Sequence, residues 1–157
     1  MQFTDTTLTS EKLILSHAAN LQRPANGTLE LLPLCNMNCD MCYIRQSNPE
    51  VKAQGGLHTA DEWIRLGHEM AKAGVLFLLL TGGEPLLFPD FRKLYTELKQ
   101  MGMILTINTN GTLLDEAWAE FFGKYKPRRI NITLYGSNDD AYEKLCHYPG
   151  GFSRTVN

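Results

Sequence analysis

Short apolar segments alternate with amphipathic segments along most of this chain. The run Val75–Thr81 is almost wholly apolar, which is typical of a strand covered on both faces in a parallel sheet. Three similar runs recur, separated by helical patterns, and such alternation favours parallel strands joined by right-handed crossovers. The pattern therefore predicts an α/β protein built on a parallel sheet of βα units. The expected strands are residues 28–34, 75–81, 103–109 and 129–134.

Three amphipathic segments follow the helical period and begin at polar residues that cap helices. Thr59 and Glu62 have the spacing of a capping box, and Asp90 and Asp115 precede the next two segments. We expect these helices to end at Gly74, at Gly102 and near Pro127.

The remaining segments have weaker patterns. Residues 44–58 are expected to form a loop, because Pro49, Gly55 and Gly56 interrupt regular structure. Residues 1–27 are expected to form an N-terminal extension with a short helix within residues 10–17. A further helix is expected to start near Ser153.

The carboxyl ends of the expected strands are polar or rich in glycine. Ligands of parallel α/β folds bind at these ends, so the four segments that follow the strands should meet at one rim. Gly82 and Gly83 would expose backbone there, and the carboxylate of Glu84 could accept the ammonium group of an amino acid. Asn110-Gly111 also fits an ordinary turn. The four segments are residues 35–42, 81–85, 108–111 and 133–136.

Three of the four cysteines, Cys35, Cys39 and Cys42, lie within eight residues of one another. Thiolates this close can converge on one metal centre, and sulfur ligands favour zinc or iron–sulfur clusters. A closed zinc site would need a fourth ligand, for which Cys146, His58 and His147 are the candidates. A cubane cluster held by three thiolates leaves one iron free to bind another molecule. A disulfide with one free thiol is a further alternative.

Composition narrows the class of protein. A chain of 157 residues with 43% apolar and 20% charged residues is typical of one globular domain. The net charge of −2 and the scattered basic residues give no reason to expect nucleic-acid binding. The longest apolar run, residues 75–80, is far shorter than the ~20 residues that span a bilayer. We therefore expect a cytoplasmic protein without a membrane partner.

The spacing Cys-x-x-x-Cys-x-x-Cys at Cys35, Cys39 and Cys42 resembles the signature of the radical S-adenosylmethionine (SAM) superfamily. The resemblance implies that these cysteines hold a [4Fe-4S] cluster whose open iron chelates the amino and carboxylate groups of SAM. The family often has an aromatic residue just before the third cysteine, where this chain has Met41. Tyr43, directly after that cysteine, is common in one large branch.

The same resemblance implies further contacts to SAM. Gly82-Gly83-Glu84-Pro85 is similar to the family's Gly-Gly-Glu motif, which contacts the amino group of SAM. Asn108 and Asn110 lie in a segment that resembles the motif on the third strand. Thr133 occupies the fourth-strand position where the family often has a serine that helps position SAM.

Residues 133–152 resemble the branch whose members carry a C-terminal SPASM extension and often modify peptides or proteins. The resemblance implies a partial (β/α)6 TIM-like barrel, of which residues 28–157 would supply the first four units and be incomplete at the C-terminus. Such a piece alone is expected to be inactive, to expose apolar side chains of residues 75–80 and 130–134, and to associate. The implied activity is reductive cleavage of SAM to a 5'-deoxyadenosyl radical. The implied partners are a peptide or protein substrate and an electron donor of the flavodoxin or ferredoxin type.

A hypothesis from a different class is a non-catalytic iron–sulfur or zinc module with a structural or electron-transfer role. It predicts a fourth protein ligand, with Cys146 or His147 as the main candidates. An enzyme instead keeps an open coordination position that faces the glycine-rich segment at residues 82–85.

Overall fold

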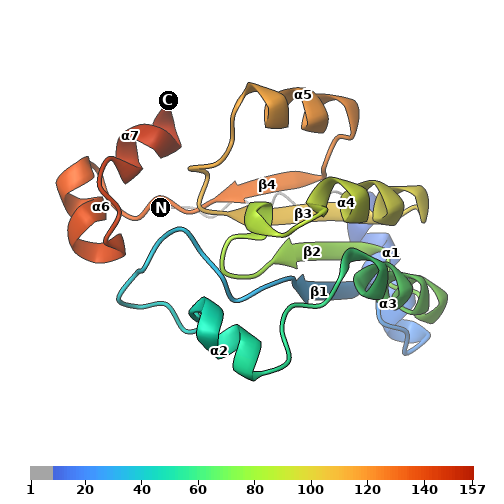
Figure 1. Cartoon of the computed structure of the whole chain (residues 1–157). Helices are drawn as coiled ribbons and strands as arrows, with labels where there is room; N and C mark the ends of the chain where they lie inside the picture. The colour runs from blue at the N-terminus through green and yellow to red at the C-terminus, as the bar shows by residue number, and fades with distance from the viewer. Residues whose placement is uncertain (1–8) are drawn as a thin grey trace.

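The computed structural model describes residues 9–157, so the part of the expected extension in residues 1–8 lies outside the described chain. Four parallel strands form one sheet in the order β1-β2-β3-β4, which is also their order in the sequence. Because all three strand pairings are parallel, the four carboxyl ends lie at the same end of the sheet (Figure 1). The expected α/β class and the alternation of strands with helices are confirmed. The strands are β1 (Asn26–Glu30), β2 (Phe77–Thr81), β3 (Ile104–Thr109) and β4 (Arg129–Ile132).

The first strand differs most from its expected bounds. It begins at Asn26 rather than residue 28, so the expected boundary between extension and core falls inside a strand. It ends at Glu30 rather than residue 34, because Pro33 has no amide hydrogen to continue a regular ladder. The chain beyond Glu30 still lies along the segment that follows β2, which becomes important at the site.

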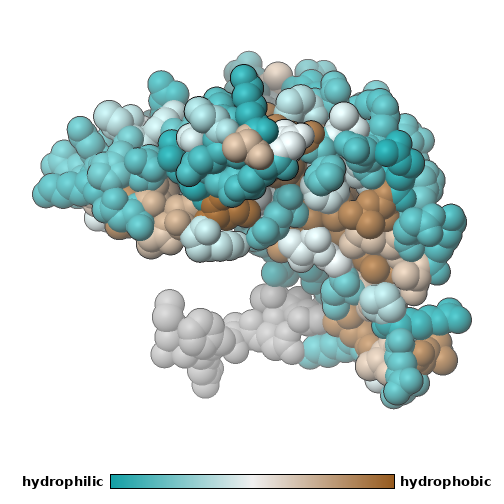
Figure 2. Space-filling view, turned by 60° about the horizontal axis from the view of Figure 1, so that its bottom comes forward, coloured by the Kyte–Doolittle hydropathy of each residue, from teal (hydrophilic) through white to brown (hydrophobic). Residues whose placement is uncertain are grey.

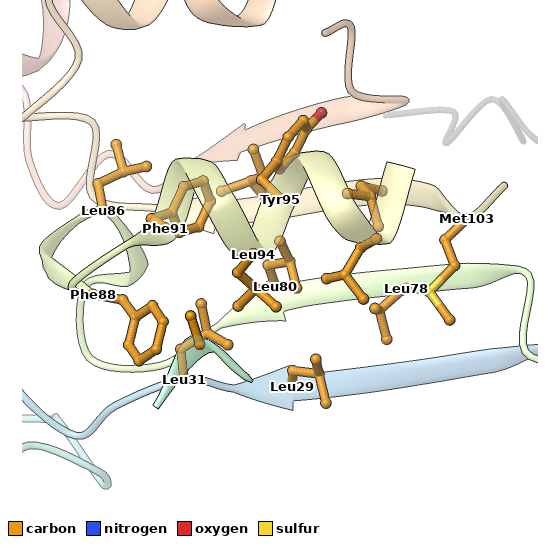
Figure 3. Close-up of a cluster of buried hydrophobic side chains, with 14 of the residues drawn as sticks. Leu29, Leu31, Leu78, Leu80, Leu86, Phe88, Phe91, Leu94, Tyr95 and Met103 are labelled. Atoms are coloured by element: carbon orange, nitrogen blue, oxygen red, sulfur yellow. The ribbon is translucent and has the colours of Figure 1, made fainter. Parts of the chain in front are cut away.

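The core lies between the sheet and the helices α3 (Ala60–Ala73) and α4 (Phe91–Gln100). Leu94 and Leu98 of α4 are fully buried in one cluster with apolar residues of β2 and β3. Figure 3 shows Leu94 beside Leu80 of β2. Gly67 lets α3 approach α4, because a Cβ there would lie 2.5 Å from Leu98 Cδ2. The expectation that residues 75–80 would be exposed is wrong, since each is buried or half-buried. On the last strand and beyond it, Ile132 and Leu134 are exposed, as expected.

The expected loop at residues 44–58 was wrong, because it contains the helix α2 (Asn48–Ala53). Glu50 accepts hydrogen bonds from the backbone and the hydroxyl of Ser47 in a capping box. Pro49 lies in the first turn, where its missing N–H costs nothing, so this proline starts a helix rather than breaking one.

Two helices follow β4, namely α6 (Asp139–Cys146) and α7 (Gly151–Val156). The helix α6 was not predicted from the sequence, although Asn138 caps it by accepting a hydrogen bond from the amide of Ala141. The helix α7 starts at Gly151 rather than near Ser153. Asp115 caps α5 (Glu116–Lys124) as expected. The C-terminal segment thus returns toward the carboxyl ends of the strands (Figure 1).

The helix α1 (Thr9–Asn20) lies near the amino ends of the strands and is longer than expected. None of its residues is fully buried, and Leu13 is exposed, as is Leu21 just after the helix. Apolar surface is visible near the bottom of Figure 2. An ion pair between Glu11 and Arg128 links it to the start of β4. No helix between residues 9 and 157 has the length and apolarity needed to cross a bilayer.

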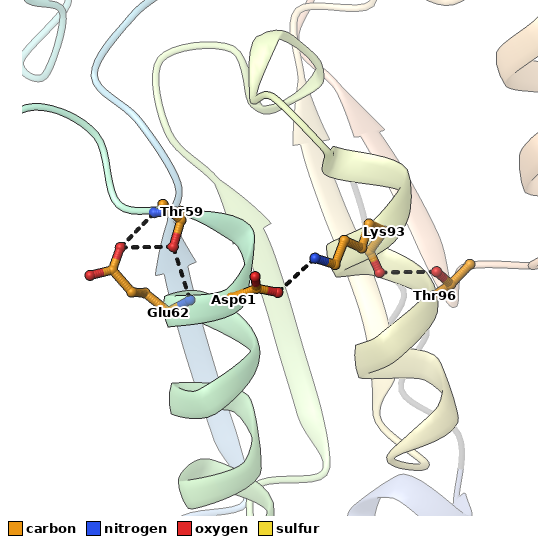
Figure 4. Close-up of polar contacts among 5 residues, drawn as sticks. All are labelled: Thr59, Asp61, Glu62, Lys93 and Thr96. Atoms are coloured by element: carbon orange, nitrogen blue, oxygen red, sulfur yellow. Dashed lines mark hydrogen bonds and ion pairs between the residues drawn. The ribbon is translucent and has the colours of Figure 1, made fainter.

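The capping box of α3 gives a test of the local structure. Thr59 Oγ1 accepts a hydrogen bond from the amide of Glu62, whose carboxylate accepts from the amide of Thr59 at 2.7 Å (Figure 4). We expect Thr59→Ala to lower the free energy of unfolding by about 1 kcal/mol, because the first turn loses an acceptor. Thr96→Ala, within α4, is the matched control, since Thr96 Oγ1 only bonds carbonyls of its own helix. Urea unfolding should show a loss for the first variant and none for the second.

Candidate functional site

The cysteine loop is held against the glycine-rich segment by a series of backbone hydrogen bonds. The amide of Gly83 donates to Leu32 O at 2.7 Å, and the amide of Glu84 donates to Leu34 O at 2.9 Å. A Cβ on Gly83 would lie 2.3 Å from Leu34 O, and one on Gly82 would lie 2.6 Å from Leu32 O. Gly82 also has a φ of 145°, which favours glycine. The two glycines are therefore needed for the close approach of these two segments.

A cavity of about 260 Å³ opens where the strands end. All three clustered cysteines line it, together with residues that follow β2, β3 and β4. Within residues 9–157, no three Cys, His, Asp or Glu side chains are gathered closely enough to hold a single metal ion. Three thiols spread around one cavity are a donor set of the kind that holds a multi-iron cluster.

Backbone amides support the sulfur atoms of two of these cysteines. Met37 N lies 3.4 Å from Cys35 Sγ, and Arg45 N lies 3.3 Å from Cys42 Sγ. Burial raises the pKa of Cys35. The pKa of Cys39 is raised to about 12, mainly by burial and to a smaller extent by a hydrogen bond with Cys146. These two groups are therefore neutral thiols at pH 7 in the metal-free protein. Binding of iron must displace their protons, as for any thiolate ligand.

Glu84 joins the ends of β2 and β3 from inside the protein. Its side chain is fully buried, and its carboxylate accepts hydrogen bonds from Thr109 Oγ1 and the amide of Asn110, both at 2.8 Å. The amide of Leu86 donates to the same carboxylate at 3.1 Å. Burial raises the pKa of Glu84, and these hydrogen bonds oppose that shift. Because its side chain is fully buried and does not line the cavity, the carboxylate is not in reach of a ligand there.

Asn110 connects β3 to the cysteine loop. Its Nδ2 donates to Asn36 Oδ1 at 2.8 Å and lies 3.7 Å from Cys35 Sγ. Its Oδ1 accepts from the amide and the hydroxyl of Thr112, and that hydroxyl also accepts from Asn36 Nδ2 at 2.9 Å. Gly111, with a φ of 82°, makes the turn that this arrangement needs. Asn110-Gly111 thus forms a turn, and the side chain of Asn110 also contacts Cys35 and its neighbour Asn36.

The C-terminal end of α6 supports the other side of the cysteine loop. The amides of Asn38 and Asp40 donate to the carbonyls of Cys146 and Leu145 at 2.9 and 3.0 Å. The side chains of His147 and Asp40 meet at 2.6 Å. Met37, Tyr142 and Cys146 form a small buried cluster against which Cys35 and Cys39 pack.

Most of the residues predicted to bind SAM line the cavity with the cysteines. Glu84 and Pro85 do not line it and are buried behind it. The sequence analysis did not predict that Asn36, Thr112 and α6 support the cysteine loop. Asn36 and Thr112 are polar residues directly after Cys35 and Gly111, and this position could have indicated their role. The predicted residues that line the cavity are Met41, Tyr43, Gly82, Gly83, Asn108, Asn110 and Thr133. The cavity is also lined by Ile44, which was not predicted at the rim, and by four residues of the expected rim segments that were not predicted to contact SAM, namely Met37, Thr81, Thr109 and Tyr135.

Known proteins are similar to this chain in sequence and in fold. The model of the family described as the radical SAM superfamily matches residues 29–157. The chain is 33% identical over 139 residues to a PqqA peptide cyclase of Granulibacter bethesdensis, covering 88% of this chain and 36% of that protein. It is 32% identical over 127 residues to an AdoMet-dependent heme synthase of Methanosarcina barkeri, covering 81% of this chain and 36% of that protein.

The structure of Streptococcus suis SuiB bound to its precursor peptide SuiA has the same fold. The two chains superpose with a TM-score of 0.66 at 17% identity, over 98% of this chain and 35% of SuiB. This chain thus spans about a third of the length of the relatives that it matches. The family model matches residues 29–157, and a peptide cyclase is among the relatives. Both findings confirm the resemblance to the radical SAM superfamily that the sequence indicated. The chain belongs to the radical SAM superfamily.

Proposed function

We propose that this chain forms the cluster- and SAM-binding part of a radical SAM enzyme that modifies a peptide or protein. The observation that carries the proposal is the single cavity shared by Cys35, Cys39, Cys42 and the residues that follow three further strands. When bound, a [4Fe-4S] cluster would supply the electron that cleaves SAM to methionine and a 5'-deoxyadenosyl radical.

The residues of the chain would bind and orient the two cofactors. Cys35, Cys39 and Cys42 would ligate the cluster, with Asn110 and the end of α6 keeping the loop in place. The backbone of Gly82 and Gly83 is exposed to the cavity and would accept polar groups of SAM.

The other predicted contacts lie around the same cavity. Asn108 is fixed by a hydrogen bond from Asn131 Nδ2 at 2.8 Å, and Thr133 follows β4 at the same rim. Met41 and Tyr43 are exposed at its mouth, where an adenine ring could pack on them. In this proposal Glu84 contributes by holding the backbone of Asn110 rather than by touching SAM.

A peptide or protein substrate is favoured by the relatives. One is named a PqqA peptide cyclase and another an antilisterial bacteriocin subtilosin biosynthesis protein of Bacillus subtilis, 27% identical over 133 residues. A flavodoxin or ferredoxin would be a suitable electron donor, because the cluster needs one electron per SAM cleaved.

Anaerobic reconstitution with iron and sulfide tests the proposal. We expect about four irons per chain, since three thiolates suffice to hold a cubane cluster. Addition of SAM should change the electron paramagnetic resonance spectrum of the reduced cluster, because SAM would bind to the open iron. A colourless protein that binds stoichiometric zinc would refute the proposal.

The alternative, a non-catalytic metal module, is supported by one contact. Cys146 is fully buried and packs beside Cys39, where a fourth sulfur ligand could approach a metal. The iron content of Cys39 and Cys146 variants distinguishes the enzyme from the non-catalytic module.

A further inference from the structure

The side-chain amide of Asn110 faces a sulfur atom of the proposed cluster site. Its Nδ2 lies 3.7 Å from Cys35 Sγ, a separation suited to a hydrogen bond with sulfur, which is a larger atom than oxygen. Asn110 is only 6% exposed and lines the cavity at the strand ends. Hydrogen bonds to the sulfur atoms of an iron–sulfur cluster help to set its reduction potential. The contact can therefore do more than hold the loop in place.

The other contacts of Asn110 settle which end of its amide faces the sulfur. The backbone N–H of Thr112 can only donate, and it bonds Asn110 Oδ1 at 3.0 Å, so the nitrogen lies on the side of Cys35. Asn110 Nδ2 donates to Asn36 Oδ1 at 2.8 Å, Asn36 Nδ2 donates to Thr112 Oγ1 at 2.9 Å, and that hydroxyl donates to Asn110 Oδ1 at 2.7 Å. This closed ring uses one hydrogen of Nδ2 and leaves the second for Cys35 Sγ.

The backbone of Asn110 is also held by hydrogen bonds. Its N–H donates to the buried carboxylate of Glu84 at 2.8 Å, and its carbonyl accepts from Thr155 Oγ1 at 3.3 Å. Every polar atom of Asn110 thus has a partner in the described chain. A donor fixed in this way does not need to reorient when the charge of a bound cluster changes, so its N–H dipole is preorganised.

The direction of the effect follows from charge. Reduction adds one negative charge to a cluster, and donors to its sulfur ligands stabilise the reduced form, which raises the reduction potential. A cysteine that has lost its proton to iron can only accept, so the bond from Asn110 to Cys35 becomes charge-assisted. The amides of Met37 and Arg45 act on Cys35 and Cys42 in the same way, but substitution of a side chain leaves these backbone donors in place.

We propose that Asn110 is a positioning residue for the redox step, whose Nδ2–H donates to Cys35 Sγ and raises the reduction potential of the cluster. The inference rests on the proposed function, because it requires Cys35 to be a cluster ligand. It goes beyond that function by giving Asn110 a part in electron transfer from the ferredoxin- or flavodoxin-type donor. Without this hydrogen bond, the same donor would reduce a smaller fraction of the clusters.

Reduction potentials of reconstituted variants test this role. Asn110→Leu removes the donor and keeps most of the side-chain volume. We expect the ratio of reduced to oxidised cluster at a fixed potential to fall about three- to tenfold, because one hydrogen bond is lost, which equals about 30 to 60 mV for a one-electron couple. Asn110→Asp keeps an acceptor for Thr112 but adds a negative charge, so we expect a larger fall. The measurement is an anaerobic redox titration without SAM, followed by electron paramagnetic resonance of the reduced cluster.

Thr155→Val is the matched control, because Thr155 also bonds Asn110 but does so at the backbone carbonyl. The substitution removes this bond and the bond to Gly151 O at 2.8 Å, and leaves the contact between Asn110 Nδ2 and Cys35 Sγ in place. We expect a lower melting temperature of the metal-free protein and an unchanged reduction potential.

The outcomes separate failure of this inference from failure of the proposed function. A wild-type chain that takes up no iron would refute the proposed function, and this inference with it. A cluster in wild type and in Asn110→Leu with equal potentials would refute the inference alone, as would an equal fall in Thr155→Val. If one Asn110 variant holds no cluster, the potential of the other decides. Loss of the cluster from both would also overturn the inference, because Asn110 would then be needed for assembly.

Discussion

Replacement of Cys39 by alanine is expected to abolish cluster binding, whereas replacement of Cys146 should preserve it. Both sulfur atoms belong to the same small cluster of side chains, and the two thiols are in contact. The residues differ in position, since Cys39 lines the cavity and Cys146 is fully buried behind it. After anaerobic reconstitution, iron should fall from about four to less than about one per chain in Cys39→Ala, because two thiolates hold a cubane poorly.

Cys146→Ala is the matched control for this experiment. It removes a buried sulfur next to the proposed cluster site and is expected to cost about 1 kcal/mol of stability through lost packing, with the iron content retained. Circular dichroism and thermal melting should confirm that both variants fold. Equal loss of iron in the two variants would instead identify Cys146 as a fourth ligand and would favour the non-catalytic module.

Glu84→Ala is expected to give the largest loss of stability of any single substitution at the site. It removes one buried carboxylate and leaves three donors, Thr109 Oγ1 and the amides of Leu86 and Asn110, without their acceptor. A buried donor without a partner costs about 1 to 3 kcal/mol, so we expect a loss of at least about 3 kcal/mol in urea unfolding. Glu120→Ala, on the exposed face of α5, is the control and should change stability by less than about 0.5 kcal/mol.

Glu84→Gln adds a dependence on pH. Because burial raises the pKa of Glu84, the folded protein binds this proton more tightly than the unfolded chain does. The contribution of this proton to the stability of the fold is therefore complete when the pH is below 4.5, the pKa of Glu84 in the unfolded chain. It is lost as the pH rises through the pKa of Glu84 in the folded protein. Glutamine cannot titrate, so the free energy of unfolding of wild type minus that of Glu84→Gln should decrease as pH rises from 4 to 8. A difference that grows with pH would show that the hydrogen bonds outweigh burial.

Local sequence patterns predicted those helices and strands that depend on interactions between residues close in the chain. The all-apolar run before Thr81 became β2, and the capping residues Thr59 and Asp115 start helices as expected. Asp90 precedes α4, but it adopts a left-handed φ of 59° and makes no side-chain cap bond. One error came from a residue that fits two kinds of structure. Pro49 was interpreted as a breaker, although a proline in the first turn starts a helix equally well.

The sequence by itself determined the order of the four strands, the class of fold, and the placement of the cysteines and glycines at one rim, because parallel strands bring their carboxyl ends together. Only the tertiary structure decided what each side chain does there. Glu84 turns inward to hold Asn110, and the end of α6 returns to hold Asn38 and Asp40. These contacts depend on directions and distances between segments remote in sequence, which neither periodicity nor spacing encodes.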